Sequence, residues 1–288
     1  MNRTYANFML LGVTVVWGGG FIATSGALDS LSPFYIMMLR FLGAAILPLL
    51  FCFKKLRTLD SYIIRRGLLT GVFLFLAFAF QTFGLKYSTP SKNAFLTATN
   101  VVFVPYLLWM YLKRKPNQKE IIASLLCVIG IALLTLKPEG FQLGLGDVLS
   151  IICAFFFATH MIALERYANH CDAVVMTTLQ MIGAGVLSFI CAMLFESPPE
   201  QFSISAIGNV AYLIFISTLL AYLLQTYAQR YTSANSASLI LSMEALFASL
   251  FSFLIYRETM NVYMMIGAAL IFMSIIYIEY KPKKRRNT

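Results

Sequence analysis

One segment of this chain occurs twice, and each copy closes an apolar run. Residues 81–87 read Gln-Thr-Phe-Gly-Leu-Lys-Tyr, and residues 225–231, 144 positions later, read Gln-Thr-Tyr-Ala-Gln-Arg-Tyr. Each half of the chain contains five apolar runs. Because five is odd, the second half must enter a bilayer from the side opposite to the first, which makes the halves inverted repeats.

Apolar residues make up 59% of the chain and charged residues 12%. The runs are long enough to cross ~30 Å of hydrocarbon at ~1.5 Å per residue, and they lack the alternation of barrel strands. Each is predicted to be an α-helix, because a bilayer core offers no partner to unpaired backbone groups. The sequence predicts an all-α integral membrane protein of ten transmembrane helices, arranged as two inverted five-helix repeats, residues 1–138 and 139–288. The predicted spans are 6–27, 33–53, 67–85, 93–112, 120–136, 147–167, 172–195, 206–226, 235–256 and 260–280.

The Lys and Arg residues lie mainly on one side of these spans. The opposite side carries only Lys86, Lys92, Lys137 and Arg257, and Arg40 lies within a span. By the positive-inside rule, we expect a multi-pass protein of the cytoplasmic membrane with both termini in the cytoplasm. The net charge of +10 is then a topology signal, and no nucleic-acid partner is needed to explain it.

The repeat has a defined register. The first two spans of each half align at an offset of 140, so Arg40 matches Gln180, and the next three align at 144, so Asn100 matches Glu244. A longer connection or span end in the second half would explain why the offset rises from 140 to 144. Because the first span has a counterpart, we expect it to be retained rather than cleaved as a signal peptide.

The chain resembles the EamA family of the drug/metabolite transporter superfamily over nearly its whole length. The matching segments are 17–21 (Trp-Gly-Gly-Gly-Phe), 87–105, 121–134 and 231–258. The resemblance implies a ten-helix fold of two inverted repeats around a central cavity, with small metabolites as cargo. The chain departs from the family at Ala245, where a proline often follows the glutamate, and at Phe157, where a tryptophan is usual.

Two ionisable residues are predicted near the middle of the membrane, where a charge costs roughly 2.5–3.5 kcal/mol on insertion scales. Glu244 would bind a cation or amine, or take a proton when the site is empty. Arg40 would hold a substrate carboxylate through two hydrogen bonds. The alternative for both is a structural ion pair, with Arg40 and Glu244 as partners.

Further polar residues are candidates for the same site. Asn93, Thr97 and Asn100 recur at i, i+4 and i+7, on one face of the fourth helix, where they would line an aqueous cavity or make interhelical hydrogen bonds. His160 would shuttle protons or serve as a packing residue. Trp17 beside three glycines would form a cavity wall, or the glycines would serve close helix packing.

Other function classes are less well supported by the sequence. Residues 144–147 match the Gly-x-Gly-Asp pattern of intramembrane proteases, but no second aspartate lies inside a span. The chain lacks a His-Glu-x-x-His zinc motif and a phosphate-binding Gly-x-x-x-x-Gly-Lys loop, and we expect no cofactor and no metal. A channel or a lipid scramblase is an alternative.

The leading hypothesis is a secondary transporter that moves an amino acid or related amine by alternating access, with proton coupling as an added hypothesis. Its partners would be a small-molecule substrate and the lipid bilayer. A homodimer is a further alternative. The sequence leaves the direction of transport open.

Overall fold

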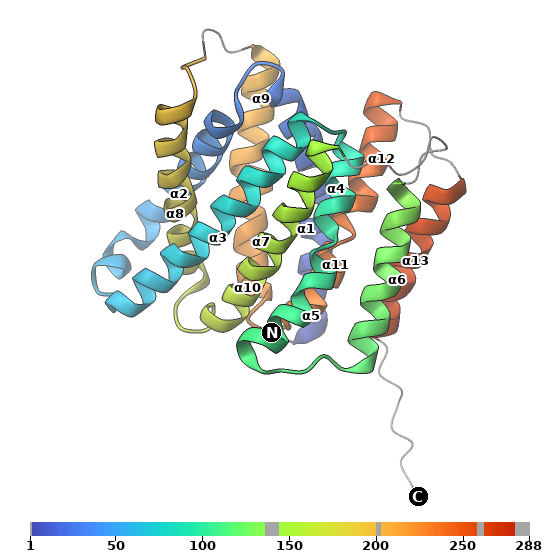
Figure 1. The fold of residues 1–288 in the computed structure, drawn as a ribbon. Helices are drawn as coiled ribbons and strands as arrows, with labels where there is room; N and C mark the ends of the chain where they lie inside the picture. The colour runs from blue at the N-terminus through green and yellow to red at the C-terminus, as the bar shows by residue number, and fades with distance from the viewer. Residues whose placement is uncertain (1, 136–143, 200–202, 258–261, 280–288) are drawn as a thin grey trace, which may run out of the picture.

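The computed structural model describes residues 2–135, 144–199, 203–257 and 262–279, and every regular element in this part of the chain is a helix (Figure 1). The helices are α1 (Arg3–Leu28), α2 (Pro33–Arg57), α3 (Ser61–Lys86), α4 (Pro90–Ala98), α5 (Asn100–Leu112), α6 (Gln118–Thr135), α7 (Leu145–Tyr167), α8 (Ala173–Phe195), α9 (Ile204–Tyr212), η1 (Leu213–Leu220), α10 (Ala221–Ala228), α11 (Ala234–Leu241), α12 (Glu244–Tyr256) and α13 (Val262–Glu279).

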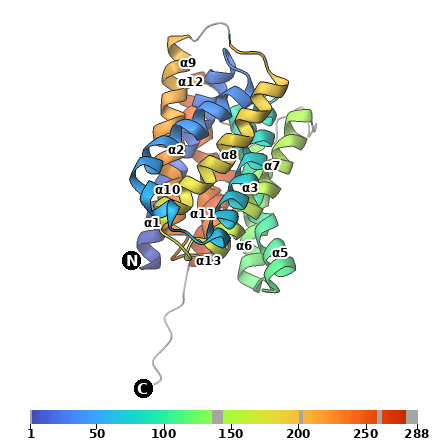
Figure 2. The same ribbon diagram turned by 90° about the vertical axis from the view of Figure 1, so that its left-hand side faces the viewer.

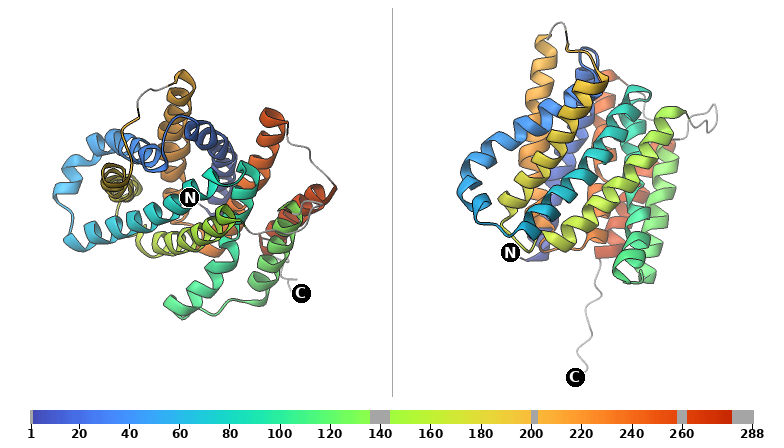
Figure 3. Two further views of the ribbon diagram at one scale, coloured as in Figure 1. Left: turned by 45° about the horizontal axis from the view of Figure 1, so that its top comes forward. Right: turned by 60° about the vertical axis from the view of Figure 1, so that its left-hand side comes forward.

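Eight helical segments of the described residues are long and apolar enough to cross a membrane. Three of these segments are composite, being α4 with α5, α9 with η1 and α10, and α11 with α12. The remaining helices, α6 and α13, each have 18 residues and pack against each other at one edge of the bundle (Figures 1 and 3). The chain is therefore an all-helical, multi-pass membrane protein.

Local sequence explains where these helices begin. Pro33 and Pro90 occupy first-turn positions, where a missing N–H costs nothing. Asp60 and Ser233 each accept a backbone hydrogen bond from the first turn of the following helix. The connection between α8 and α9, residues 196–203, is longer than that between α2 and α3, residues 58–60, and it lies where the offset between the halves rises from 140 to 144.

Helices α5 and α12 end in the same unusual way. Lys113 and Arg257 follow them with φ of 55° and 54°, a left-handed conformation uncommon for residues with a side chain. These two residues are 144 positions apart. The offset of 144 residues found in the sequence therefore also relates the backbone conformations of the two helix ends.

The fourth and ninth predicted spans are not continuous helices. The helix is interrupted by a tighter turn at Thr99 and again at Met243. The backbone N–H of Thr99 donates to the carbonyl of Leu96, three residues earlier, at 3.2 Å. The N–H of Met243 donates in the same way to the carbonyl of Ile240 at 3.1 Å. A short 3₁₀ turn inside a helix interrupts the regular hydrogen-bond pattern and often marks a functional hinge.

Pro105 removes a backbone donor from α5, as expected from its ring chemistry. The carbonyl of Val101, one turn earlier, accepts instead from the hydroxyl of Ser124 on α6, at 3.2 Å. The polar group that proline leaves unsatisfied is therefore used to join two helices.

Close helix packing explains the glycine Gly71, which follows Gly67 by one turn on α3. A Cβ at Gly71 would lie 2.6 Å from the carbonyl oxygen of Gln180 and 3.0 Å from the Cα of Gly183 on α8. Helix α8 also packs on α2, and α7 packs on α3 (Figure 2). The core is built where these small residues let the backbones approach.

Two groups of contacts lie at opposite ends of the bundle. The starts of α4 and α7 meet at the Asp147 end, where Lys92 contacts Asp147. Arg3 at the start of α1 and Glu165 near the end of α7 lie at the other, the Arg3 end. Because α7 has 23 residues, these ends are about 35 Å apart along its axis.

Candidate functional site

A cavity lies at the centre of the bundle and is lined from both halves of the chain. The first half contributes Trp17, Arg40 and Asn100, among others, and the second contributes Ser217, Tyr222 and Glu244. The free volume is about 20 Å³, roughly the room for one water molecule. The lining groups therefore leave little free space between them, and any larger solute requires side chains to move.

Arg40 is held by η1. Its Nε donates to the hydroxyl of Thr218, and its Nη2 donates to the hydroxyl of Ser217 at 3.1 Å and to the Ser217 carbonyl at 3.5 Å. The guanidinium carbon also lies 4.2 Å from the centroid of the Phe78 ring. Arg40 is 4% exposed, so the buried charge is compensated by neutral acceptors and an aromatic face.

Glu244 is the first residue of α12, directly after the break at Met243. It is 5% exposed and lines the cavity. The backbone N–H groups of the first turn of α12 bond to the carbonyls of Ser242 and Met243, so the chain passes through the break as a tightened turn. In the described part of the chain, no ion pair joins Glu244 to Arg40. The predicted structural pair is therefore absent among these residues, although both groups face the same cavity.

The cavity walls are aromatic. The ring of Tyr222 lies 5.1 Å from that of Trp17 and 6.1 Å from that of Phe78, and Phe78 meets Phe157 edge-on at 5.2 Å. The indole Nε1 of Trp17 donates to the Ser217 carbonyl at 3.0 Å. Trp17 is thus a cavity wall, as one of its two interpretations predicted.

The adjacent glycines serve helix packing as well. A Cβ at Gly18 would lie 2.5 Å from the Cβ of Phe247 and 2.8 Å from the backbone nitrogen of Ala248. Both interpretations of the Trp17 segment therefore apply, each to different residues.

The predicted polar face of the fourth span is divided by the break at Thr99. Asn100 lines the cavity. Asn93 instead donates to Ser150 on α7 at 2.7 Å and to the Gln81 carbonyl at 3.2 Å, and Thr97 accepts from Gln81 at 3.4 Å. Asn93 and Thr97 therefore make interhelical hydrogen bonds, and neither is among the residues that line the cavity.

His160 lies behind the cavity wall. Its Nε2 donates to Gln180 on α8 at 2.7 Å, and its ring is fully buried 5.9 Å from that of Tyr222. Gln180 continues the chain of hydrogen bonds to Thr226 at 3.3 Å. The structure thus places His160 in a helix-joining network, one residue layer away from Arg40 and Glu244.

Ser217 and Thr218, which hold Arg40, were not among the residues predicted from the sequence. Both lie in η1, a π-helical segment whose widened turn presents a backbone carbonyl to Trp17 and Arg40. Such segments are frequent at functional sites. The available signal was two adjacent hydroxyl residues in the otherwise apolar run Leu213–Leu220.

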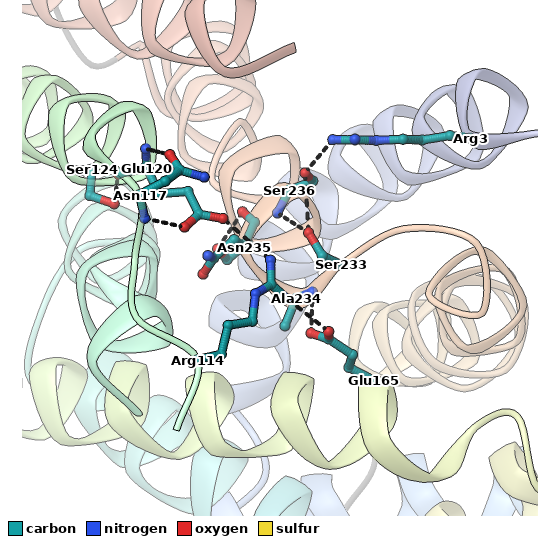
Figure 4. Close-up of polar contacts among 11 residues, drawn as sticks. Arg3, Arg114, Asn117, Glu120, Ser124, Glu165, Ser233, Ala234, Asn235 and Ser236 are labelled. Atoms are coloured by element: carbon teal, nitrogen blue, oxygen red, sulfur yellow. Dashed lines mark hydrogen bonds and ion pairs between the residues drawn. The ribbon is translucent and has the colours of Figure 1, made fainter. Parts of the chain in front are cut away.

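The Arg3 end of the bundle holds a polar network between the halves (Figure 4). Arg114, after α5, bonds to Glu165 on α7 at 3.1 Å and to Glu120 on α6 at 3.4 Å. Glu165 also accepts from the backbone N–H of Ala234 at the start of α11, at 2.7 Å. Arg3 donates to Ser236 at 2.7 Å. These contacts join α1, α6 and α7 with the start of α11.

Comparison with known proteins places the chain in a family. A family model described as the EamA-like transporter family matches residues 4–136 and again residues 144–280. The chain belongs to the EamA-like transporter family. The resemblance read from the sequence is therefore confirmed, and the family model matches each half separately.

Similar proteins carry the name of transporters. An uncharacterized transporter of Archaeoglobus fulgidus is 30% identical, over 98% of this chain and 88% of the relative. The uncharacterized transporter YetK of Bacillus subtilis is 26% identical, over 85% of this chain and 78% of the relative. A solved crystal structure of a protein superposes with a TM-score of 0.79 at 16% identity, covering 96% and 97% of the two chains, and shows a shared fold.

Proposed function

We propose that this EamA-like protein is a secondary transporter of a small zwitterion, an amino acid or a closely related amine, and that it works by alternating access. The observation that carries the proposal is the arrangement of Arg40 and Glu244. Both line one cavity, and Arg40 is held by Ser217 and Thr218 rather than by Glu244. A carboxylate and a guanidinium that face one cavity without pairing suit a cargo with both charges.

The proposed architecture is two inverted five-helix repeats, residues 1–138 and 139–288, that rock around the cavity. The matched breaks at Thr99 and Met243 and the two family-model matches support it. Carriers with inverted repeats commonly bind substrate where two helices are interrupted, because the freed backbone groups face the site. Here Asn100 and Glu244 are the first residues after the two breaks.

The Arg3 end is proposed to face the cytoplasm, in the cytoplasmic membrane, since most Lys and Arg residues lie there. Residues 86–92 would then be external and residues 230–234 cytoplasmic. Labelling of single cysteines by an impermeant reagent in intact cells tests this orientation. Equal labelling of the two segments would contradict the inverted repeat.

The cargo class is tested by reconstituting purified protein in liposomes and comparing an amino acid with its decarboxylated amine. The candidates come from a thermal-shift panel of amino acids and amines. Saturable and competable flux is expected. Arg40→Gln should raise KM for the amino acid while leaving the amine nearly unchanged, because only the amino acid has a carboxylate for Arg40 to hold. An equal effect on both compounds would contradict this role.

Glu244 is proposed to bind the amine and to take up a proton when the cargo leaves. Glu244→Gln should abolish flux driven by a pH gradient and leave a folded, monodisperse protein. Asp29→Asn is the matched control, because it also removes one carboxyl but from the exposed end of α1. Flux that does not saturate, or transfer of labelled lipid by the wild-type protein, would instead favour the channel or scramblase alternative.

A further inference from the structure

A second cavity lies on the outside of the bundle, away from the candidate transport site. It has a volume of about 380 Å³ and lies over α7 between α3 and α5. The three helices share the right-hand side of the molecule in Figure 2, where α7 contacts both α3 and α5. Its walls are mainly apolar, with Leu69, Phe73, Phe155, Phe156 and Ile162 among them. We call it the α3–α7 groove.

Two arginines mark the end of the groove nearest the Arg3 end. Arg66 and Arg166 both line it, and their guanidinium carbons lie 5.3 Å and 5.7 Å from the centroid of the same Tyr167 ring. Neither forms an ion pair with a described carboxylate. The neighbouring Glu165 is directed to Arg114 and to the N–H of Ala234 instead. The groove therefore ends in two positive charges that lack a negative partner in the described chain.

The groove has the length of one membrane leaflet. From Phe155 to Arg166 along α7 the rise is about 16 Å, which is about half of the ~30 Å hydrocarbon thickness. Its charged end lies in the first turns of α3 and the last turn of α7, at the level where helices leave the membrane. Tyr111 at the mouth is 61% exposed, as is common for tyrosine at a membrane interface.

We propose that the α3–α7 groove is a binding site for one anionic phospholipid of the leaflet at the Arg3 end. The lipid phosphate lies between Arg66 and Arg166, and one acyl chain lies along Phe155 and Phe156. The charges and the apolar wall are both required, because a zwitterionic lipid brings a cationic group to the arginines and a free phosphate has no contact with the aromatic residues. Basic pockets between membrane helices bind anionic head groups by the same physics.

The test is native mass spectrometry of the purified full-length protein, titrated with phosphatidylglycerol or phosphatidylcholine of the same acyl chains. The wild type should retain phosphatidylglycerol roughly 30-fold more strongly, the ratio that two charges worth about 1 kcal/mol each give. The double variant Arg66→Gln with Arg166→Gln should lose this preference. The control is Arg57→Gln with Arg65→Gln, which removes two charges from exposed positions at the same end and should keep it.

A second variant tests the acyl chain without changing any charge. Thr159 lines the groove and is half-buried, and its hydroxyl makes an exposed hydrogen bond, so Thr159→Trp fills the groove without disturbing the core. This variant should also lose lipid retention. The proposal is overturned if the wild type shows no preference, if the control loses it equally, or if Thr159→Trp retains lipid at the wild-type level. A species of twice the chain mass whose formation depends on Phe155 and Arg166 would assign the groove to a second copy of the chain.

Discussion

Lys92 and Asp147 form an ion pair of 2.7 Å between the start of α4 and the start of α7. At the opposite end of the bundle, Arg3 at the start of α1 contacts Ser236 near the start of α11, also at 2.7 Å. Lys92 and Ser236 are 144 positions apart, so the same helix contact occurs at both ends. This contact joins two full charges at the Asp147 end, and a charge and a hydroxyl at the Arg3 end.

The first prediction concerns this ion pair. In a double-mutant cycle of Lys92→Gln and Asp147→Asn, the coupling should be about 1 kcal/mol in the free energy of unfolding, because Asp147 is almost fully buried and Lys92 is a third exposed. Reversible denaturation in mixed micelles measures it. The matched cycle of Lys86→Gln with Asp147→Asn should be additive, since Lys86 is exposed. Additivity in both cycles would show that the pair does not stabilise the Asp147 end.

The second prediction concerns the contact between α3 and α8. Gly71→Ala should reduce the free energy of unfolding by about 1–3 kcal/mol, because the new Cβ meets a backbone carbonyl at 2.6 Å and neither backbone can give way cheaply. Gly12→Ala is the matched control, since a Cβ at Gly12 meets nothing within 4 Å. The same unfolding assay measures both. A Gly71→Ala protein as stable as Gly12→Ala would contradict the close approach.

The third prediction uses the two tryptophans. Trp17→Phe keeps an aromatic wall but removes the Nε1–H that donates to the Ser217 carbonyl, so it should cost about 1 kcal/mol of stability. Trp109→Phe should change stability by less than about 0.5 kcal/mol, because Trp109 is 47% exposed. Each variant also leaves one tryptophan for fluorescence. Quenching by an aqueous or lipid-borne quencher should then be strong when Trp109 remains and weak when Trp17 remains. The reverse order would place Trp17 outside the core.

The fourth prediction is a pH dependence at the start of α8. Asp172 lies just before the helix, and its pKa is held below the usual value by the N–H of Val174 and then by Lys55, at 2.9 Å and 3.0 Å. A lowered pKa in the folded state means that the stabilisation is present above the ordinary aspartate pKa. It is lost as the pH falls through the lower, folded value.

Asp172→Asn tests this pH dependence. Asn keeps a capping oxygen but carries no charge, so the variant should lose less thermal stability than the wild type between about pH 6 and about pH 3. Thermal midpoints across that interval measure the difference. Parallel curves for the two proteins would mean that Asp172 makes no net contribution. The salt bridge to the exposed Lys55 should add little, because surface pairs are weak.

Much of the fold could be predicted from the sequence, because a segment that crosses a membrane must be apolar over its whole length. Apolar runs of span length predicted the helices. The alignment of Asn100 with Glu244 predicted which residues of the two halves correspond. The backbone agrees at that register, since α5 and α12 begin at those two residues and end before Lys113 and Arg257. Rare charges inside apolar runs also identified Arg40 and Glu244, which do reach one cavity.

The partners of these residues were decided by the tertiary structure. A period of 3.6 places Asn93, Thr97 and Asn100 on one face only while the helix continues, and the turn at Thr99 divides them between α7 and the cavity. Arg40 pairs with Ser217 and Thr218 because a π-helical turn, which has no periodic signature in the sequence, presents a hydroxyl and a carbonyl at its position. The sequence by itself determined which segments are apolar enough to enter a membrane and which residues are costly to bury there. Three-dimensional packing determined how each of those costs is met, since a buried charge can be satisfied by any neighbour that the fold brings within hydrogen-bonding distance.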